Sequence, residues 1–242
     1  MNRTENIDYC IRYLLKQNDV KADTPHTMAE KRQLLRALMN IWKPQPLSAE
    51  FLRAQDAELQ AQLREKGVVM TRDRVWQGDI TRLKVDAIVN AANGMGLGCW
   101  HPLHACIDNC IHSAAGLQLR QECNNILQGS EIATGGAIIT PGYNLPAKYV
   151  IHTVGPIIHT DTPTVGEEEQ LAACYRSCLN RAREHDCRSI AFCCISTGEF
   201  HFPNRRAAEI AVKVCKEARI RVVFNVFKDI DLGIYKELLK IG

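Results

Sequence analysis

From Val68 onward, short apolar runs alternate with segments of helical periodicity. Runs such as SIAFCC and IRVVFNV would be apolar on both faces of a strand, which is typical of central strands covered by helices on each side. Alternation of this kind predicts a three-layer α/β domain. The segments that fit strands are RVWQGDI, DAIVNAAN, GAIITPG, KYVIHTVG, SIAFCCIST and IRVVFNVF. The segments that fit helices between them are CIDNCIHSAAGLQLRQECN, EEQLAACYRSCLNRAREH, NRRAAEIAVKVCKEA and DLGIYKELLK.

The first 67 residues lack this alternation and have helical patterns throughout. Thr27 followed by Glu30 matches a capping box, the side-chain pattern that starts many helices. Ser48 fits the start of the next helix, and Gly67 fits its end. We find no set of catalytic residue types here. The sequence therefore predicts a helical extension, 1–67, packed on a main domain, 68–242.

Charge and cysteine usage limit the class of protein. The formal net charge is only +3, and no Lys/Arg run with interleaved aromatic residues is present, which argues against a duplex nucleic-acid binder. The polar N-terminus and the lack of a membrane-length apolar stretch predict a cytoplasmic protein without a membrane partner. Eleven cysteines, an odd number without secretory features, predict buried thiols or metal ligands instead of disulfides.

A candidate phosphate loop follows one of the buried strands. Ser196, Thr197 and Gly198 come directly after SIAFCCI, and a helix is expected a few residues later. In open α/β sheets, ligands collect at the carboxyl ends of strands, and helix N-termini attract anions. Phe200 and Phe202 could flank a sugar. The alternative is an ordinary turn, since neither a Walker loop nor a dinucleotide-binding glycine pattern is present.

A candidate metal site lies beside the same expected cleft. Cys99, His104 and Cys106 fall within eight residues, and thiolate and imidazole ligands suit zinc. Three protein ligands leave a fourth tetrahedral position open, which is typical of catalytic zinc. The alternative is that Cys106 and Cys110 are simply buried one helical turn apart. Three neighbouring side chains remain alternative ligands at this point: His101, Cys110 and His112.

The remaining thiols and one histidine have core patterns. Their spacing along helix faces or within strands predicts burial without a metal partner. The residues assigned to the core are Cys174, Cys178, Cys193, Cys194 and His152, and Cys187 and Cys215 have no companion at metal spacing.

The segment from about Val75 to Tyr235 resembles a macrodomain, the ADP-ribose-binding family. Five ordered motifs carry the resemblance: GDIT at 78–81, DAIVNAAN at 86–93, IDNCIHSAAG at 107–116, TPGYNLPAKYVIHTVGP at 140–156 and SIAFCCISTGEFHFP at 189–203. The resemblance implies a three-layer fold with a mixed, mostly parallel central sheet covered by helices on both faces.

The resemblance also implies roles for individual residues. Asp79 would accept a hydrogen bond from the adenine amino group, with Ile80 beside it. Asn93 and Asp108 would orient the distal ribose and the attacking water. The residues implied to surround the pyrophosphate and distal ribose are Ser196, Thr197, Gly198, Glu199 and Phe200.

Two departures from the commonest macrodomain pattern narrow the resemblance. GCWHPLHACIDN stands where most members have a glycine run, and His201 replaces a glycine. Both are similar to the zinc-dependent branch, which has an N-terminal helical extension. That branch implies Zn²⁺-dependent removal of mono-ADP-ribose from Asp or Glu side chains. The implied substrate is a lipoyl-carrier protein modified by a sirtuin-type ADP-ribosyltransferase. The alternatives are a non-catalytic ADP-ribose reader with structural zinc, and an unrelated nucleotide enzyme.

Overall fold

The central feature of the computed structural model, which describes residues 2–160 and 162–241, is a six-stranded sheet. Its strand order is β1-β6-β5-β2-β4-β3, and every neighbouring pair is parallel except β3 and β4. The mixed, mostly parallel sheet is therefore confirmed. The strands are β1 (Val75–Gln77), β2 (Ala87–Ala91), β3 (Ala137–Pro141), β4 (Tyr149–Thr153), β5 (Ser189–Phe192) and β6 (Arg221–Val226).

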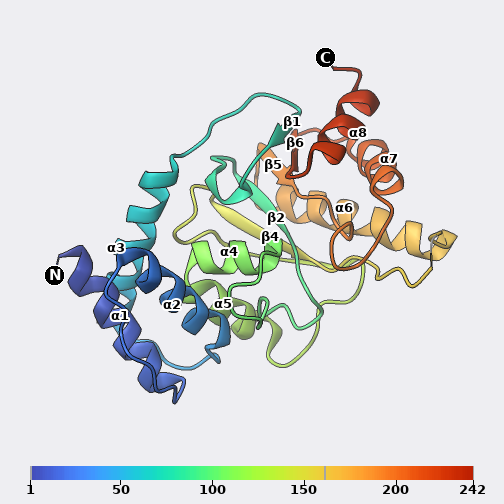
Figure 1. The fold of residues 1–242 in the computed structure, drawn as a ribbon. Helices are drawn as coiled ribbons and strands as arrows, with labels where there is room; N and C mark the ends of the chain where they lie inside the picture. Colours follow the sequence, from blue (N-terminus) through green and yellow to red (C-terminus); the bar gives the residue numbers. More distant parts are fainter. Residues whose placement is uncertain (1, 161, 242) are drawn as a thin grey trace.

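Helices cover both faces of this sheet, as predicted. On one side lie α4 (Ile107–Ala115) and α5 (Leu117–Leu127), and on the other lie α6 (Val165–Glu184), α7 (Asn204–Cys215) and α8 (Asp229–Leu239) (Figure 1). All four residues of β5 are buried, and so are the first four of β2. Strands that are apolar on both faces therefore bury both faces, which is the physical basis of the three layers.

The segment CIDNCIHSAAGLQLRQECN is expected to form one helix, because its apolar pattern is continuous, but it forms two helices. Gly116 separates them with φ of 100°, a left-handed backbone that favours glycine. A Cβ at this position would lie 2.6 Å from Gln118 Oε1 and 2.8 Å from Gln55 Nε2. The amide of Leu117 donates to Gln55 Oε1 of the N-terminal helices at 2.9 Å, so the break also connects the two regions.

Three helices form the N-terminal extension: α1 (Arg3–Gln17), α2 (Met28–Ile41) and α3 (Ala49–Lys66). The capping box of Thr27 with Glu30, the Ser48 cap and the Gly67 terminus are confirmed. Their apolar side chains, together with Leu117 of α5, form a hydrophobic cluster apart from the main core, and its fully buried members include Ile11, Trp42 and Phe51. They pack on the α4–α5 side of the sheet, with α2 against α4 (Figure 1).

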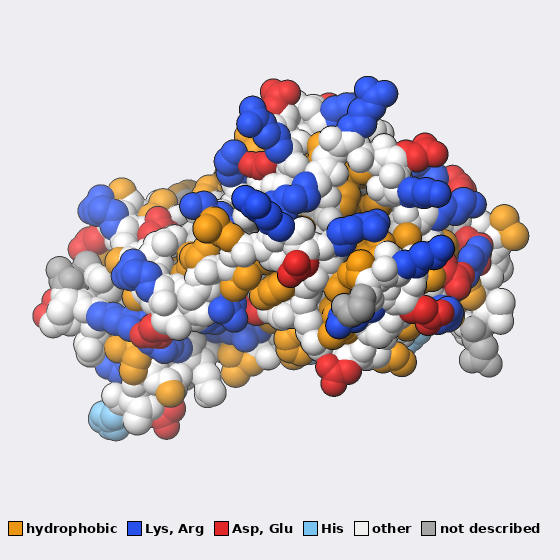
Figure 2. Space-filling view, turned by 90° about the horizontal axis from the view of Figure 1, so that it is seen from above, with side chains coloured by type: hydrophobic (Ala, Val, Ile, Leu, Met, Phe, Trp, Pro, Cys, Tyr) orange, Lys and Arg blue, Asp and Glu red, His pale blue; other side chains and the backbone are white. Residues whose placement is uncertain are grey.

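Charged side chains are spread over the surface. On the face seen in Figure 2, Lys and Arg side chains are interspersed with Asp and Glu, and apolar side chains show between them. None of the helices in the described part of the chain is long and apolar enough to cross a membrane.

Candidate active site

The loop between β2 and α4 carries the predicted metal ligands, and we call residues 98–106 the metal loop. It begins at Gly98, which has φ of 82° and approaches His112 so closely that a Cβ there would lie 2.8 Å from the ring, so the position requires glycine. It ends at Cys106, the N-cap of α4, whose Sγ accepts a hydrogen bond from the Asn109 amide at 3.4 Å. The loop is therefore held at both ends by α4.

The structure brings Cys99, His104 and Cys106 together. One donor atom from each lies within 4.8 Å of the other two, and Cys99 Sγ is 3.6 Å from His104 Nδ1. All three side chains are partly exposed, so the group is open to solvent on one side. Two sulfurs and one imidazole nitrogen at this separation fit a tetrahedral zinc ion with one position left for another ligand.

The charge environment is also compatible with a cation. Burial, with the nearby Cys99 and Asp108 adding to it, raises the pKa of the Cys106 thiol to about 12. Two neighbouring thiolates repel each other unless a positive ion lies between them. On the other side of the imidazole, His104 Nε2 lies 3.8 Å from Glu199 Oε1. A carboxylate at that nitrogen would orient the ring so that Nδ1 faces the sulfurs.

The alternative ligands lie elsewhere. Cys110 contacts Arg36 of α2, whose Nη2 is 3.7 Å from its Sγ. His112 belongs to a second, buried group with Cys123 and His152. His101 belongs to neither group.

This second group has the features of a polar core. His152 is fully buried, as predicted, and burial lowers its pKa to about 3, so the ring is neutral. Its Nδ1 is 3.1 Å from Asn90 Nδ2, and its Nε2 is 3.1 Å from Thr140 Oγ1. Both ring nitrogens of His152 therefore already have hydrogen-bond partners, which favours a structural role.

Asp108 lies in the first turn of α4, two residues after Cys106, and is only 5% exposed. Its Oδ1 accepts a 2.7 Å hydrogen bond from Asn90 Nδ2, and its Oδ2 lies 3.4 Å from Asn93 Nδ2. Burial raises the pKa of the Asp108 carboxyl to about 6, although the Asn90 hydrogen bond and the charge of Arg120 oppose the rise. The carboxylate thus lies beside the metal loop with a pKa near neutral pH.

Asn90 was not identified from the sequence. The signal for it was available, because an asparagine that is fully buried in an apolar strand needs a hydrogen-bond partner. The partner could not be named without the fold, since it lies 18 residues further along the chain.

The predicted phosphate loop, residues 196–200, connects β5 to α7. Ser196 is buried and has φ of 64°, an uncommon backbone for a residue other than glycine. Within the described residues, the buried polar atoms near β2, the metal loop and this loop that have no hydrogen-bond partner include Ser196 Oγ, Asn93 Oδ1, Trp100 Nε1 and Asn90 Oδ1. Unpartnered buried polar atoms of this kind are typical of sites that receive a ligand.

The two phenylalanines differ from expectation. Phe202 is 1% exposed and belongs to the main hydrophobic core, so the prediction that it flanks a sugar is wrong. Its amide returns to the Ser196 carbonyl at 2.9 Å, which turns the side chain inward. Phe200 is partly exposed and packs against a small apolar cluster that includes Leu127 and Val154.

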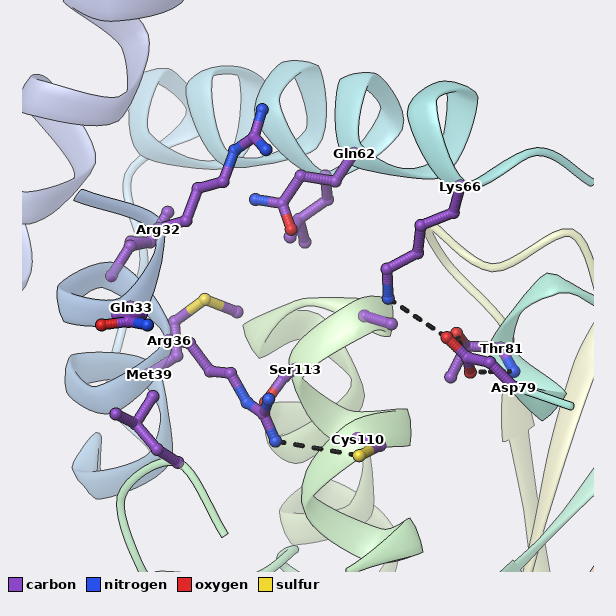
Figure 3. Close-up of a pocket in the computed structure, with 14 residues that line it drawn as sticks. Arg32, Gln33, Arg36, Met39, Gln62, Lys66, Asp79, Thr81, Cys110 and Ser113 are labelled. Carbon is purple, nitrogen blue, oxygen red and sulfur yellow. Dashed lines mark hydrogen bonds and ion pairs between the residues drawn. The ribbon is translucent and has the colours of Figure 1, made fainter. Parts of the chain in front are cut away.

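Asp79 lies at the end of β1, where it caps a short 3₁₀ helix, η1 (Ile80–Arg82). Its Oδ1 accepts from the Thr81 amide at 3.0 Å, and its Oδ2 pairs with Lys66 Nζ of α3 at 3.2 Å (Figure 3). Burial acts against ionisation, but the Thr81 hydrogen bonds and the Lys66 charge together keep the pKa of Asp79 below its usual value. Ile80 is 4% exposed and packs in the main core.

Asp79 borders a pocket between the extension and the main domain (Figure 3), and the volume of this pocket is about 440 Å³. Arg32, Arg36 and Lys66 line it from α2 and α3, and Cys110 lines it from α4. The extension therefore reaches both the Asp79 end and the metal-loop end of the candidate site.

Comparison with known proteins agrees with this fold. The Macro domain family model matches residues 89–211, about half of the chain. A protein-ADP-ribose hydrolase of Treponema medium is 48% identical over 99% of this chain and all of its own length. A protein-ADP-ribose hydrolase of Staphylococcus aureus strain MSSA476 is 47% identical over 91% of this chain and 88% of its own.

Solved structures show the same similarity. A macrodomain of Oceanobacillus iheyensis with ADP has a TM-score of 0.61 and 40% identity, covering 69% of this chain and 88% of that one. A Trypanosoma brucei macrodomain in complex with ADP-ribose has a TM-score of 0.61 and 28% identity, covering 89% and 97%. Fold and site together define an α/β protein whose candidate site residues follow the carboxyl ends of its parallel strands β2 and β5. The chain belongs to the macrodomain family.

Proposed function

We propose that this macrodomain is a zinc-dependent hydrolase that removes mono-ADP-ribose from modified Asp or Glu side chains of proteins. The observation that carries the proposal is the placement of Cys99, His104 and Cys106 within 4.8 Å of one another, on a loop that leads directly to Asp108. The names of the relatives in Treponema medium and Staphylococcus aureus support the hydrolase class. On the resemblance described above, the modified protein would be a lipoyl carrier and its modifier a sirtuin-type ADP-ribosyltransferase.

Different residues of the candidate site would bind different parts of ADP-ribose. Asp79 would accept from the adenine amino group, next to Ile80. The backbone of Ser196, Thr197 and Gly198, together with the unpartnered Ser196 hydroxyl, would bind the pyrophosphate in front of the N-terminus of α7, where helix amides favour an anion. Glu199 and Phe200 would border the distal ribose.

Asn93 and Asp108 are the polar residues proposed for the chemical step. At pH 7.5 a carboxyl with a pKa of about 6 is ionised, so Asp108 would accept the proton of the attacking water. The Asn93 amide donates toward Asp108, while its Oδ1 is free to accept a ribose hydroxyl. Zinc held by Cys99, His104 and Cys106 would supply Lewis-acid stabilisation of the oxygen that becomes negative.

The test is metal removal. Purified protein should contain about one zinc per chain, and a chelator should lower the rate of release of ADP-ribose from a modified protein by roughly 100-fold or more. Added Zn²⁺ should restore the rate, and circular dichroism should show that the sheet persists throughout. Full turnover by metal-free protein would contradict the proposal. Zinc and ADP-ribose binding without turnover would indicate the non-catalytic reader.

Gly155 provides a test of the phosphate loop. It follows β4, and a Cβ there would lie 1.9 Å from Ser196 Oγ and 2.9 Å from Ile195 Cγ2. Gly155→Ala should therefore displace Ser196 and weaken ADP-ribose binding roughly tenfold, measured by calorimetry, since overpacking of this kind costs about 1–3 kcal/mol. Gly233→Ala is the matched control, because the added Cβ would have no atom within 4 Å apart from its chain neighbours and the backbone of its own helix. Equal affinity of the two variants would argue against a role for Ser196.

A further inference from the structure

The N-terminal extension contacts the metal loop through several polar side chains, although it contributes none of the three proposed ligands. We infer that α2 positions the metal-binding side chains and that Arg36 is the principal positioning residue. This inference rests on the proposed metal role of Cys99, His104 and Cys106, and it assigns a function to helices that supply no catalytic group.

Arg36 connects α2 to two of the three ligands. Its Nη2 donates to the His104 carbonyl oxygen at 2.8 Å, and its Nε and Nη2 donate to Asn109 Oδ1 at 3.1 and 2.7 Å. The Asn109 amide in turn donates to Cys106 Sγ, and its Nδ2 donates to the His101 carbonyl at 2.9 Å. One guanidinium therefore fixes the backbone at His104 and, through Asn109, the sulfur of Cys106. Figure 3 shows the Arg36 side chain reaching from α2 to α4.

Asn40, one turn further along α2, holds the middle of the metal loop. Its Oδ1 accepts from the Leu103 amide at 3.0 Å, and its Nδ2 donates to Ser113 Oγ of α4 at 3.0 Å. Leu103 has φ of 60°, which a leucine rarely adopts, so this backbone conformation needs stabilising contacts from another element. Asn40 is only 1% exposed and is well placed to give it.

Arg120 of α5 connects the end of α2 to the third ligand. Its Nη2 lies 3.4 Å from the carbonyl oxygen of Cys99, and its guanidinium is 4.3 Å from the centre of the Trp100 ring. Its Nη1 donates to three carbonyl oxygens at the C-terminal end of α2: Met39 at 3.1 Å, Asn40 at 2.8 Å and Trp42 at 2.8 Å.

His104 is thus connected to α2 directly, whereas Cys106 and Cys99 are each connected to α2 through one intermediate residue. Ligands that are already held in place lose less conformational freedom when the ion binds, and outer hydrogen-bond partners typically change metal affinity by about 10–100-fold. Lysine at position 36 would keep the charge but lose the planar fork that contacts His104 and Asn109 together.

The experiment compares Arg36→Lys with Arg32→Lys. Arg32 lies one helical turn earlier and borders the same pocket, but it pairs with Glu58 and Glu65 instead of the loop. Competition with a chromophoric chelator should show zinc bound about 10–100-fold more weakly by Arg36→Lys and within about threefold of wild type by Arg32→Lys. In metal-free protein, amide hydrogen exchange should speed up across residues 98–106 in Arg36→Lys alone, with β4 unchanged.

The outcomes separate the two proposals. Wild-type protein that binds no zinc would overturn the proposed function, while the exchange measurement on metal-free protein would still decide whether Arg36 orders the loop. Unchanged zinc affinity together with unchanged loop exchange in Arg36→Lys would overturn the inference. If that variant does not fold, Asn40→Ala decides in the same way, because it removes the acceptor of the Leu103 amide.

Discussion

Asp108→Asn should lower the turnover number for release of ADP-ribose from a modified protein by about 10²–10⁴-fold. The amide is nearly the same size as the carboxyl, but it cannot take a proton from water. ADP-ribose affinity should stay within a few-fold of wild type, because the substitution keeps the volume and polarity of the site. Single-turnover kinetics and calorimetry on the same preparations would measure the two quantities separately.

Asp231→Asn is a closely matched control for that variant. Asp231 is also 5% exposed, lies in the first turn of a helix, and accepts a 2.7 Å hydrogen bond from an asparagine, Asn204. It belongs to α8, on the other side of the sheet. Its variant should keep turnover within about threefold of wild type, so that any general cost of altering a buried aspartate is visible. If Asp108→Asn behaved like this control, the assignment of the catalytic base would be wrong.

Replacing Arg120 by methionine should lower the free energy of unfolding by about 3–5 kcal/mol. Arg120 is 2% exposed, and burial lowers its pKa to about 10, so the guanidinium still carries its charge at neutral pH. The variant would leave the carbonyl groups at the end of α2 without their donor, and the negative end of that helix without its cation. Urea unfolding of metal-free protein would measure the loss.

Arg176→Met controls for the removal of an arginine as such. Arg176 pairs with Glu169 on the exposed surface of α6, and exposed ion pairs of this kind contribute about 0–1 kcal/mol. A similar small loss for Arg120→Met would show that the end of α2 is stabilised by other contacts.

The layers of the fold and the helix ends follow from local sequence. Strands that are apolar on both faces require cover on both sides, and Thr27, Ser48 and Gly67 mark helix ends through contacts within a few residues. The metal loop could also be predicted from the sequence, because Cys99, His104 and Cys106 are close in sequence as well as in space. The division of the chain at residue 67 into separate domains stays a prediction.

Contacts between distant segments could not be predicted in this way. Arg36 donates a hydrogen bond to Asn109, which is 73 residues away in the sequence, and Arg120 donates one to Asn40, which is 80 residues away. In the sequence, both arginines are ordinary members of amphipathic helices, and only the packing of α2 on the main domain gives them partners. Phe202 shows the opposite error, because its place beside the phosphate loop suggested a ligand contact, but its backbone turns the ring into the core.

The apolar cluster of α1–α3, which reaches the main domain only at Leu117 of α5 among its buried members, has a consequence for how the molecule unfolds. A region with its own core can open as a unit while the sheet remains intact. Such an opening would release the anchors of Cys99, His104 and Cys106 together and leave β2, β5 and the loops that follow them largely formed. If the proposed zinc site is correct, the interface that holds α1–α3 in place would therefore also set how long the ion stays bound.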